Sequence, residues 1–258
     1  MRPIIDGLAD LSAAAVCLPN RSSSVCWPVP ESVPLNSQWP GRHDLVWIRP
    51  ESRVAVAAQV SDGELHAHLA VWLAADRPLV VARQPCNTAL PDRISVGLAL
   101  PPAQGRRRIG LVVTMQDIIR HTPPLRLADA IAHAPAEWQP ALVELDAVTK
   151  DMGIELRVFG SLAWQALSGL NYMTLKSDID LFWHPQTNTQ LQQGIALLER
   201  WERDHGLRAD GEVLFGADSA VSWREWATLK SGDDSRVLVK RLYSAELVDA
   251  RELLGMLA

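Results

Sequence analysis

The chain has 258 residues, of which 48% are apolar, and its formal net charge is -5 at pH 7. This apolar content is enough for one large domain or two small ones. The negative balance excludes a general attraction to nucleic acid or to an anionic membrane, and no apolar run reaches the roughly 20 residues that cross a bilayer. The isolated cysteines Cys17, Cys26 and Cys86 offer neither a disulfide framework nor metal-ligand spacing, so we expect a cytoplasmic protein.

The first 40 residues differ in composition from the rest of the chain. Residues 20–40 are rich in Ser and Pro, and prolines break helices and central strands. We therefore expect residues 1–40 to form a poorly ordered leader with a short helix over residues 8–16. An incorrectly assigned start codon would give the same composition. Asp6 and Asp10 interrupt the apolar stretch near the beginning, so a signal peptide is not expected.

Ordered structure is expected to begin at residues 42–48. From there to residue 113, short apolar runs alternate with turn residues, which predicts strands, or short buried helices where alanine is dense, as over residues 65–75. The apolar runs lie at residues 54–58, 78–83, 94–98 and 108–113. Residues 117–133 are predicted to be helical. Residues 138–152 predict a clearer amphipathic helix that ends near Gly153.

Beyond Gly153 the predicted order changes to strand, turn, helix and strand. Strands are expected at residues 155–159, 178–183, 210–215 and 237–242, and helices at residues 162–170 and 189–205. We divide the chain into the leader, a smaller mixed α/β N-terminal domain over residues 41–138, and a catalytic domain over residues 139–258.

Two aspartates, Asp178 and Asp180, lie one residue apart on the second of these strands. Because side chains alternate along a strand, both carboxylates point to the same face, while the apolar residues between and after them point to the other. Two like charges side by side repel and are costly to bury. A hard divalent cation between them would offset this cost, since Mg²⁺ prefers carboxylate oxygens.

Two further features accompany the acidic pair. Gly160 and Ser161 follow a strand and open a helix, where free N–H groups and the positive end of the helix dipole attract an anion. Glu212 lies on the third strand, and Asp210 precedes it by two residues on the same face. A phosphate-binding turn beside two or three carboxylates is what metal-assisted phosphoryl or nucleotidyl transfer requires.

Each of these features has a common structural explanation when taken alone. A Gly-Ser pair before a helix is usually a turn and cap, an Asp-x-Asp pair is often a solvated strand end, and a lone strand Glu is usually exposed. The combination is much rarer, and it favours a catalytic role for Asp178 and Asp180. We take Glu212 as the third catalytic and metal-binding acid, with Asp210 as the alternative, because spacing alone does not separate them.

The order of elements over residues 155–215 resembles the nucleotidyltransferase superfamily that includes DNA polymerase beta. The resemblance implies an α+β fold whose C-terminal domain is a polymerase-beta-like mixed sheet flanked by helices. It makes Asp178 and Asp180 ligands of Mg²⁺, with Mn²⁺ as a substitute, and Gly160 and Ser161 the phosphate-binding turn. The separation of Ser161 from Asp178 is long for the superfamily, and it leaves residues 171–176 without a role.

A closer resemblance covers the chain from residue 42 to its end. It is carried by Arg-His-Asp-Leu-Val-Trp at 42–47, Phe-Gly-Ser-Leu-Ala-Trp-Gln-Ala-Leu-Ser-Gly-Leu at 159–170, Ser-Asp-Ile-Asp-Leu at 177–181, Asp-Gly-Glu-Val at 210–213 and Val-Ser-Trp-Arg-Glu-Trp at 221–226. These segments resemble the malonate decarboxylase holo-acyl-carrier-protein synthases, also called phosphoribosyl-dephospho-CoA transferases. The resemblance implies transfer from 2'-(5''-triphosphoribosyl)-3'-dephospho-CoA to a serine of the apo acyl-carrier subunit of malonate decarboxylase, with release of pyrophosphate.

Several basic residues are candidates for supporting roles. Lys240 near the C-terminal strand is a candidate phosphate ligand, although a solvated strand edge is the commoner role of such a lysine. Arg42, His43 and Arg224 lie in the matching segments and are expected either to contact the donor or to serve the fold. Two other functions remain open: a nucleotidyltransferase acting on a small molecule or another protein, and a catalytically silent protein that binds the carrier. The intact acidic pair argues against the silent protein.

Overall fold

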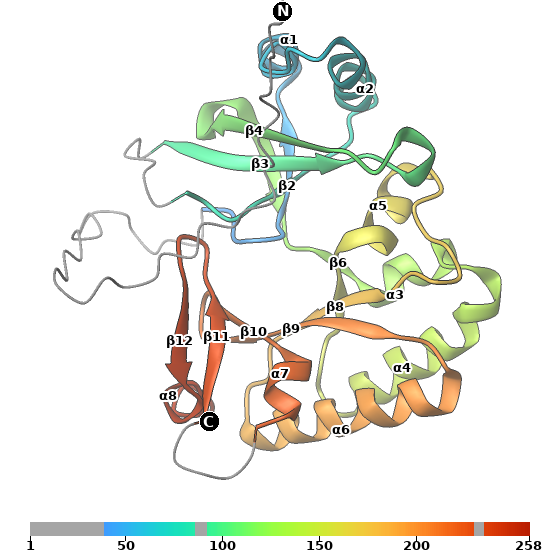
Figure 1. Cartoon of the computed structure of the whole chain (residues 1–258), viewed down its shortest axis with the longest axis vertical. Coiled ribbons are helices and arrows are strands. Elements are labelled where there is room, and N and C mark those ends of the chain that lie inside the picture. Colours follow the sequence, from blue (N-terminus) through green and yellow to red (C-terminus); the bar gives the residue numbers. More distant parts are fainter. Residues whose placement is uncertain (1–38, 86–91, 230–234) are drawn as a thin grey trace, which may run out of the picture. The chain divides into compact units, whose positions relative to one another are not determined.

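The computed structural model describes residues 39–85, 92–229 and 235–258, which all lie within one compact unit, Asn36–Ala258 (Figure 1). Residues 1–38 of the predicted leader, its helix and the three cysteines lie outside the described residues. Two sheets organise the described part of the chain. We call residues 39–122 the N-terminal lobe and residues 125–258 the C-terminal lobe.

The N-terminal lobe is built on a five-stranded sheet in the order β4-β3-β2-β1-β5, in which every neighbouring pair is antiparallel. Along β4, Ile109, Leu111 and Val113 are buried while the residues between them are not, so one face of the strand packs on the core. Its elements are β1 (Leu45–Ile48), α1 (Arg53–Ala57), α2 (Gly63–Ala74), β2 (Leu79–Val81), β3 (Arg93–Ala99), β4 (Arg108–Thr114) and β5 (Ile118–Thr122).

The structure decides one open sequence prediction in this region and contradicts another. The apolar run at residues 54–58, expected as a strand or as a short helix, lies on helix α1 (Arg53–Ala57): a short 3₁₀ helix at Pro50–Ser52 leads directly into it, and Val54 is 80% exposed. The predicted helix over residues 117–133 is helical in its second half, at α3 (Leu127–Ala130) and the following 3₁₀ turn. Its first half is strand β5, which pairs with β1, because a β-branched run there is followed by two prolines that interrupt a helix.

The C-terminal lobe is built on a seven-stranded sheet in the order β12-β11-β10-β9-β8-β7-β6. The β8–β9 pair is parallel and the other pairs are antiparallel, so the sheet is mixed. Its remaining elements are β6 (Leu125–Arg126), α4 (Gln139–Asp151), β7 (Arg157–Val158), α5 (Gly160–Ser168), β8 (Ile179–Trp183), α6 (Asn188–His205), β9 (Ala209–Phe215), β10 (Ser219–Ser222), α7 (Trp223–Ala227), β11 (Arg236–Lys240), β12 (Ala245–Asp249) and α8 (Ala250–Leu254).

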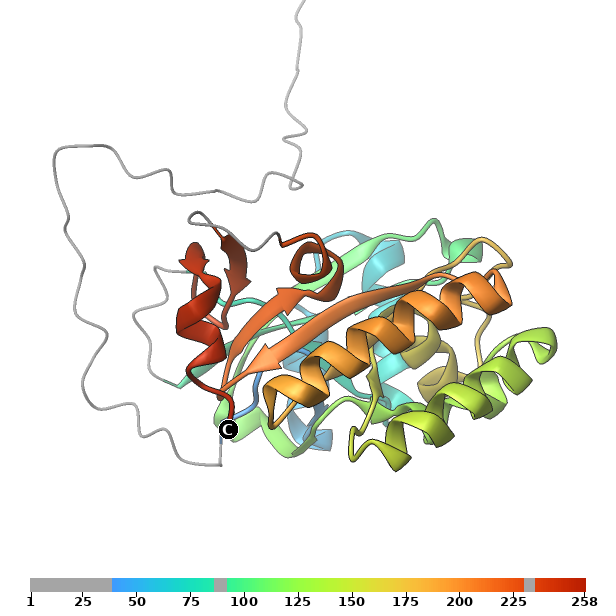
Figure 2. The same cartoon turned by 90° about the horizontal axis from the view of Figure 1, so that it is seen from below.

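Helices cover one face of this sheet. In both views α4 and α6 lie side by side along β8 and β9 (Figures 1 and 2). Ile179, Leu181 and Trp183 of β8 are buried in the same core as residues of these helices. The expected α+β class, with a mixed C-terminal sheet flanked by helices, is therefore confirmed. The opposite face of β8 and β9 carries the polar residues considered below.

The segment after α5 joins the two lobes. Tyr172 and Trp164 belong to the apolar core of the N-terminal lobe, although both lie in the C-terminal half of the sequence. The Tyr172 hydroxyl donates to the carbonyl oxygen of Ala99 at 2.8 Å, and Arg77 Nη2 donates to the carbonyl oxygen of Ser168 at 2.9 Å. The loop at residues 171–176, which had no role predicted from the sequence, thus connects the two lobes through Tyr172.

We predict that Gly211→Ala disrupts the centre of the mixed sheet. Gly211 has a φ of +135°, and a β-carbon on it would overlap the backbone carbonyl of Leu181 on the neighbouring strand. The clash and the left-handed backbone together should lower the free energy of unfolding by about 3 kcal/mol or more, measured by urea denaturation. Gly110→Ala on β4 is the matched control, because a β-carbon there meets open space. Similar unfolding free energies for the two variants would contradict the prediction.

Candidate active site

The acidic strand has the alternation that its sequence predicts. Asp180 lies on β8 between two buried apolar residues, Ile179 and Leu181, and its side chain is on the opposite face. Asp178 immediately precedes β8, is 38% exposed, and pairs with Arg208, whose Nε lies 3.4 Å from Asp178 Oδ2. Asp180 is therefore the more enclosed of the two carboxylates.

The carboxylate of Asp180 lies directly against the beginning of helix α5. Gly160, the first residue of the helix, has a φ of +62°, and a β-carbon on it would overlap Oδ2 of Asp180. The backbone N–H of Ser161 donates to the Asp180 carboxylate. Only glycine leaves room for this approach, which places a negative charge at the positive end of the helix dipole. The predicted Gly-Ser turn is therefore in contact with the predicted acidic strand.

Several negative charges act on Asp180. Burial and the neighbouring charges of Asp210, Asp178 and, more weakly, Glu212 raise the pKa of Asp180 to about 6, against the lowering effect of the Ser161 N–H. Asp210 contributes the most of the three because it pairs with Asp180 across the parallel strands β8 and β9. The carboxylates of Asp180 on β8 and Asp210 on β9 are therefore neighbours on the sheet.

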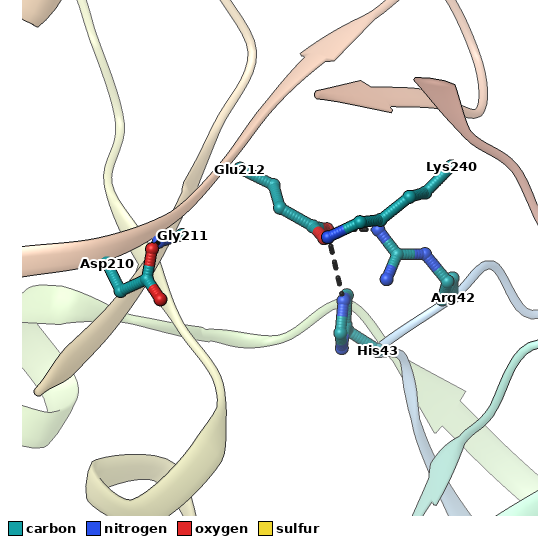
Figure 3. A network of polar contacts seen from close by, with 6 residues as sticks. All are labelled: Arg42, His43, Asp210, Gly211, Glu212 and Lys240. Carbon is teal, nitrogen blue, oxygen red and sulfur yellow. Dashed lines mark hydrogen bonds and ion pairs between the residues drawn. The ribbon is translucent and has the colours of Figure 1, made fainter. Parts of the chain in front are cut away.

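Glu212 has a different environment, although it is only two residues from Asp210 on β9. It is 5% exposed, and both of its carboxylate oxygens are hydrogen-bonded. Oε2 accepts from Arg42 Nη2 and lies 3.4 Å from His43 Nε2, and Oε1 accepts from Lys240 Nζ at 3.1 Å. Figure 3 shows the Glu212 side chain extended toward these three residues, with Asp210 outside the group. We call Arg42, His43, Glu212 and Lys240 the Glu212 cluster.

The charges within the Glu212 cluster determine its protonation states. Burial alone would raise the pKa of Glu212, but the hydrogen bond from His43 and the charge of Arg42 outweigh it and hold this pKa well below its ordinary value. Burial lowers the pKa of His43, against the opposing hydrogen bond to Glu212. Glu212 is therefore a carboxylate held ionised by its partners, which makes it a poor proton acceptor.

His43 connects the Glu212 cluster with the beginning of helix α5. Its imidazole stacks on Phe159, with ring centroids 4.2 Å apart, and meets the edge of Phe182 at 6.3 Å. Its backbone has a φ of +72°, an uncommon conformation for a residue other than glycine. The turn is closed by the hydrogen bond from Gly41 N–H to Asp44 Oδ2 at 2.8 Å. The N-terminal lobe therefore places Arg42 and His43 against the polar face of the C-terminal sheet.

Arg224 is not part of this group. Its Nη2 donates to the carbonyl oxygen of Ala209 at 2.7 Å and pairs with Glu202 of α6, and its guanidinium lies over the ring of Trp223 with Cζ 4.5 Å from the ring centroid. These contacts tie α6 and α7 to the start of β9. Of the two roles expected for Arg224, the structure shows the contacts of the structural one.

The sequence singled out the residues of the acidic pair, the turn and the third strand, and the structure brings them together. It did not identify Phe159 and Phe182 as the surfaces against which His43 packs, or Arg208 as the partner of Asp178. Phe159 preceding the Gly-Ser turn was the available signal for the first contact. Within the described ranges, no group of three or more His, Cys, Asp or Glu side chains has the spacing of a metal site.

Two family models match consecutive parts of the chain. The phosphoribosyl-dephospho-CoA transferase MdcG N-terminal domain matches residues 41–124, and the corresponding C-terminal domain matches residues 126–251. The chain belongs to the phosphoribosyl-dephospho-CoA transferase family. The two models of this family meet where the chain passes from β5 to β6, and so from one sheet to the other.

Curated members of the phosphoribosyl-dephospho-CoA transferase family are similar over most of their length. The phosphoribosyl-dephospho-CoA transferase of Xanthomonas campestris pv. campestris (strain 8004) is 43% identical over 201 residues, which cover 78% of this chain and 90% of that protein. That of Bradyrhizobium diazoefficiens is 34% identical over 219 residues, covering 84% and 93%. That of Azotobacter vinelandii is 31% identical over 218 residues, covering 81% and 92%. No solved structure matches the chain.

These matches confirm the family resemblance and show that the chain is an enzyme, a transferase. Among the helices that the structure describes, none is long and apolar enough to span a membrane.

We predict that Asp180→Asn raises the free energy of unfolding at neutral pH when EDTA has removed divalent cations from the protein. The folded-state pKa of about 6 lies above the ordinary value of 3.8, so the stability of the wild type falls as pH rises from about 4 to about 6 and stays lower above that. At pH 7.5 in EDTA the variant should unfold with a free energy higher by on the order of 1–2 kcal/mol, or a Tm higher by roughly 2–8 °C. The difference should shrink as pH falls toward 4.

Asp178→Asn serves as the control for this measurement. Asp178 is more exposed and has Arg208 as a partner, so its change should alter the unfolding free energy by no more than about 0.5 kcal/mol. A lower Tm for Asp180→Asn than for wild type at pH 7.5 would contradict the electrostatic account of Asp180.

Proposed function

We propose that this transferase moves the 2'-(5''-phosphoribosyl)-3'-dephospho-CoA group from its 5''-triphosphoribosyl donor to a serine of the apo acyl-carrier subunit of malonate decarboxylase. Family membership supports the transfer of this prosthetic group. The observation that carries the proposal is the meeting of Asp178, Asp180 and Asp210 beside the N-terminus of α5, because a polyphosphate donor needs both a cation site and an anion site.

The transfer is a displacement at the phosphorus nearest the ribose. The bond between the serine Oγ and that phosphorus forms, and the bond from the phosphorus to the bridging oxygen of the next phosphate breaks. Pyrophosphate leaves with the electron pair of the broken bond. The serine proton passes to a carboxylate of the site, and we assign this role to Asp210 because Glu212 is held ionised by Arg42 and His43.

The carboxylates fit a divalent cation by their chemistry. Their oxygens are the ligands that Mg²⁺ prefers, and the charges acting on Asp180 from Asp210, Asp178 and Glu212 are all negative. We propose that Asp178, Asp180 and Asp210 hold Mg²⁺, or Mn²⁺, which supplies Lewis-acid stabilisation of the phosphoryl oxygens and of the leaving pyrophosphate. The carboxylates must draw closer to hold the ion, since the described residues hold no preformed metal cluster.

The turn at Gly160 and Ser161 serves the anionic part of the donor. The first backbone N–H groups of α5 have no partner within the helix; the Ser161 N–H donates to Asp180, and Gly160 has no side chain of its own to block them. We propose that these N–H groups bind phosphate oxygens of the donor while Asp180 turns toward the cation. Because the Asp180 carboxylate lies against the start of α5, a cation bound to it would lie next to a phosphate bound at the helix.

We predict that Asp178→Asn and Asp210→Asn each lower the rate of transfer at least about 100-fold, because each removes a charge that acts on the reacting phosphate. The assay follows labelled donor into the apo-carrier subunit and measures pyrophosphate release. Asp218→Asn, an exposed residue on the turn between β9 and β10, is the matched control and should keep wild-type transfer. Wild-type transfer by Asp178→Asn, or labelling of the carrier from ATP instead of the donor, would refute the proposal.

We also predict that transfer depends on a divalent cation. Chelation by EDTA should abolish it, because the grouped carboxylates then repel the triphosphate, and added Mg²⁺ or Mn²⁺ should restore it. The measurement is the rate of carrier labelling against free cation concentration, with Asp180→Asn expected to need more cation than Asp218→Asn. An undiminished rate in EDTA would exclude the cation site.

A further inference from the structure

The Glu212 cluster holds more positive than negative charge. Arg42 and Lys240 each contribute one positive charge, and Glu212 contributes one negative charge. His43 adds no charge at neutral pH, because burial lowers its pKa. The Arg42 side chain is 16% exposed and that of Lys240 is 38% exposed, so water offsets the surplus only in part. A surplus positive charge at a partly enclosed position favours an anionic ligand.

The Glu212 cluster adjoins the proposed reaction site on two sides. Glu212 follows Asp210 by two residues on β9, and its charge reaches Asp180. His43 stacks on Phe159, the residue directly before the phosphate-binding turn. The cations of the cluster and the N–H groups of α5 thus both lie near the carboxylates. A chain of three phosphates that binds at the helix has these cations within its surroundings.

We propose that Arg42 and Lys240 bind the two terminal phosphates of the donor, which leave as pyrophosphate, and that Glu212 positions these two cations and is not a metal ligand. The inference rests on the proposed function for the identity of the triphosphate. It adds that the N-terminal lobe supplies a substrate-binding residue, Arg42, to a site whose carboxylates all come from the C-terminal lobe.

Glu212 suits the role of a positioning residue because both of its oxygens are engaged. A metal ion bound to Glu212 would lie beside the cations Arg42 and Lys240, and their positive charges would repel it. Asp210, by contrast, accepts a hydrogen bond only from the neighbouring Gly211 N–H among the bonds described for its carboxylate. The guanidinium of Arg42 has further N–H donors beyond the one bound to Glu212. Two such donors can bind two oxygens of one phosphate together.

The turn at residues 41–44 supports this geometry. The left-handed backbone of His43 costs on the order of 1 kcal/mol, and the stacking on Phe159 and the bond to Glu212 offset this cost. Such strain is retained where the surroundings over-determine a conformation, as they do at binding sites. The packing of His43 therefore holds the neighbouring Arg42 in its contact with Glu212, beside the proposed phosphate site.

The test measures binding of inorganic pyrophosphate with Mg²⁺ to the full chain by calorimetry, without donor or carrier. Arg42→Met and Lys240→Met should each weaken binding about tenfold or more, and Arg42→Lys should recover part of the loss. Arg126→Met and Lys150→Met, which change exposed residues paired with a carboxylate three or four residues away, are matched controls and should bind as wild type does. Wild-type pyrophosphate affinity in Arg42→Met would overturn the assignment.

Two further measurements test the role of Glu212. Mn²⁺ binding, followed by electron paramagnetic resonance, should remain within about threefold of wild type in Glu212→Gln and be weakened at least about tenfold in Asp180→Asn. In a double-mutant cycle, Arg42→Met should cost less pyrophosphate affinity in the Glu212→Gln background than alone, which a merely structural glutamate would not produce. Loss of Mn²⁺ binding in Glu212→Gln, or independent effects in the cycle, would overturn the positioning role.

These outcomes are separable from the fate of the proposed function. If pyrophosphate binding depends on Arg42 while no carrier is labelled, the subsite stands and the acceptor is wrong. If the carrier is labelled while Arg42→Met binds pyrophosphate normally, the function stands and the subsite is wrong. Thermal unfolding of each variant, with Arg42→Lys as the milder change, distinguishes lost binding from lost folding.

Discussion

The approach of the Asp180 carboxylate to Gly160 is the contact on which the candidate active site depends. It fixes the start of α5 against β8, and it is possible only because residue 160 has no side chain. Burying a carboxylate among other carboxylates is unfavourable, and the N–H of Ser161 offsets only part of that cost. The unfavourable remainder is retained at the proposed cation and phosphate site, as is common where ionisable groups do chemistry.

The two acids of β9 show how environment separates identical chemistry. Asp210 and Glu212 are two residues apart on one strand, and both side chains end in a carboxylate. Asp210 is the cross-strand neighbour of Asp180 and shares its negative surroundings, whereas Glu212 is enclosed by Arg42, His43 and Lys240. Pairs of carboxylates whose surroundings push their properties apart commonly divide their roles. This difference supports the proposal that Asp210 serves the reacting phosphate and that Glu212 positions the neighbouring cations.

The parts of the site that were predictable from the sequence are the parts fixed locally. The alternation of β8 follows from the period of a strand, and the turn at Gly160 follows from a glycine between a strand and a helix. The difference between the surroundings of Asp210 and those of Glu212 was not predictable, because it depends on Arg42, which lies 170 residues from Glu212 in sequence. The error over residues 117–133 has the same origin, since β5 exists by pairing with β1.

The contacts between the two lobes hold Arg42 and the start of helix α5 in fixed relative positions. Tyr172 anchors the segment after α5 in the core of the N-terminal lobe, and His43 packs the N-terminal lobe against the residue before α5. Helix α5 is thus held by the N-terminal lobe near both of its ends, while its first turn carries the Asp180 contact. A displacement of the N-terminal lobe would move Arg42 and the turn at Gly160 and Ser161 together. These two proposed phosphate contacts therefore keep their mutual spacing, which binding of one phosphate chain at both would require, although they lie far apart in the sequence.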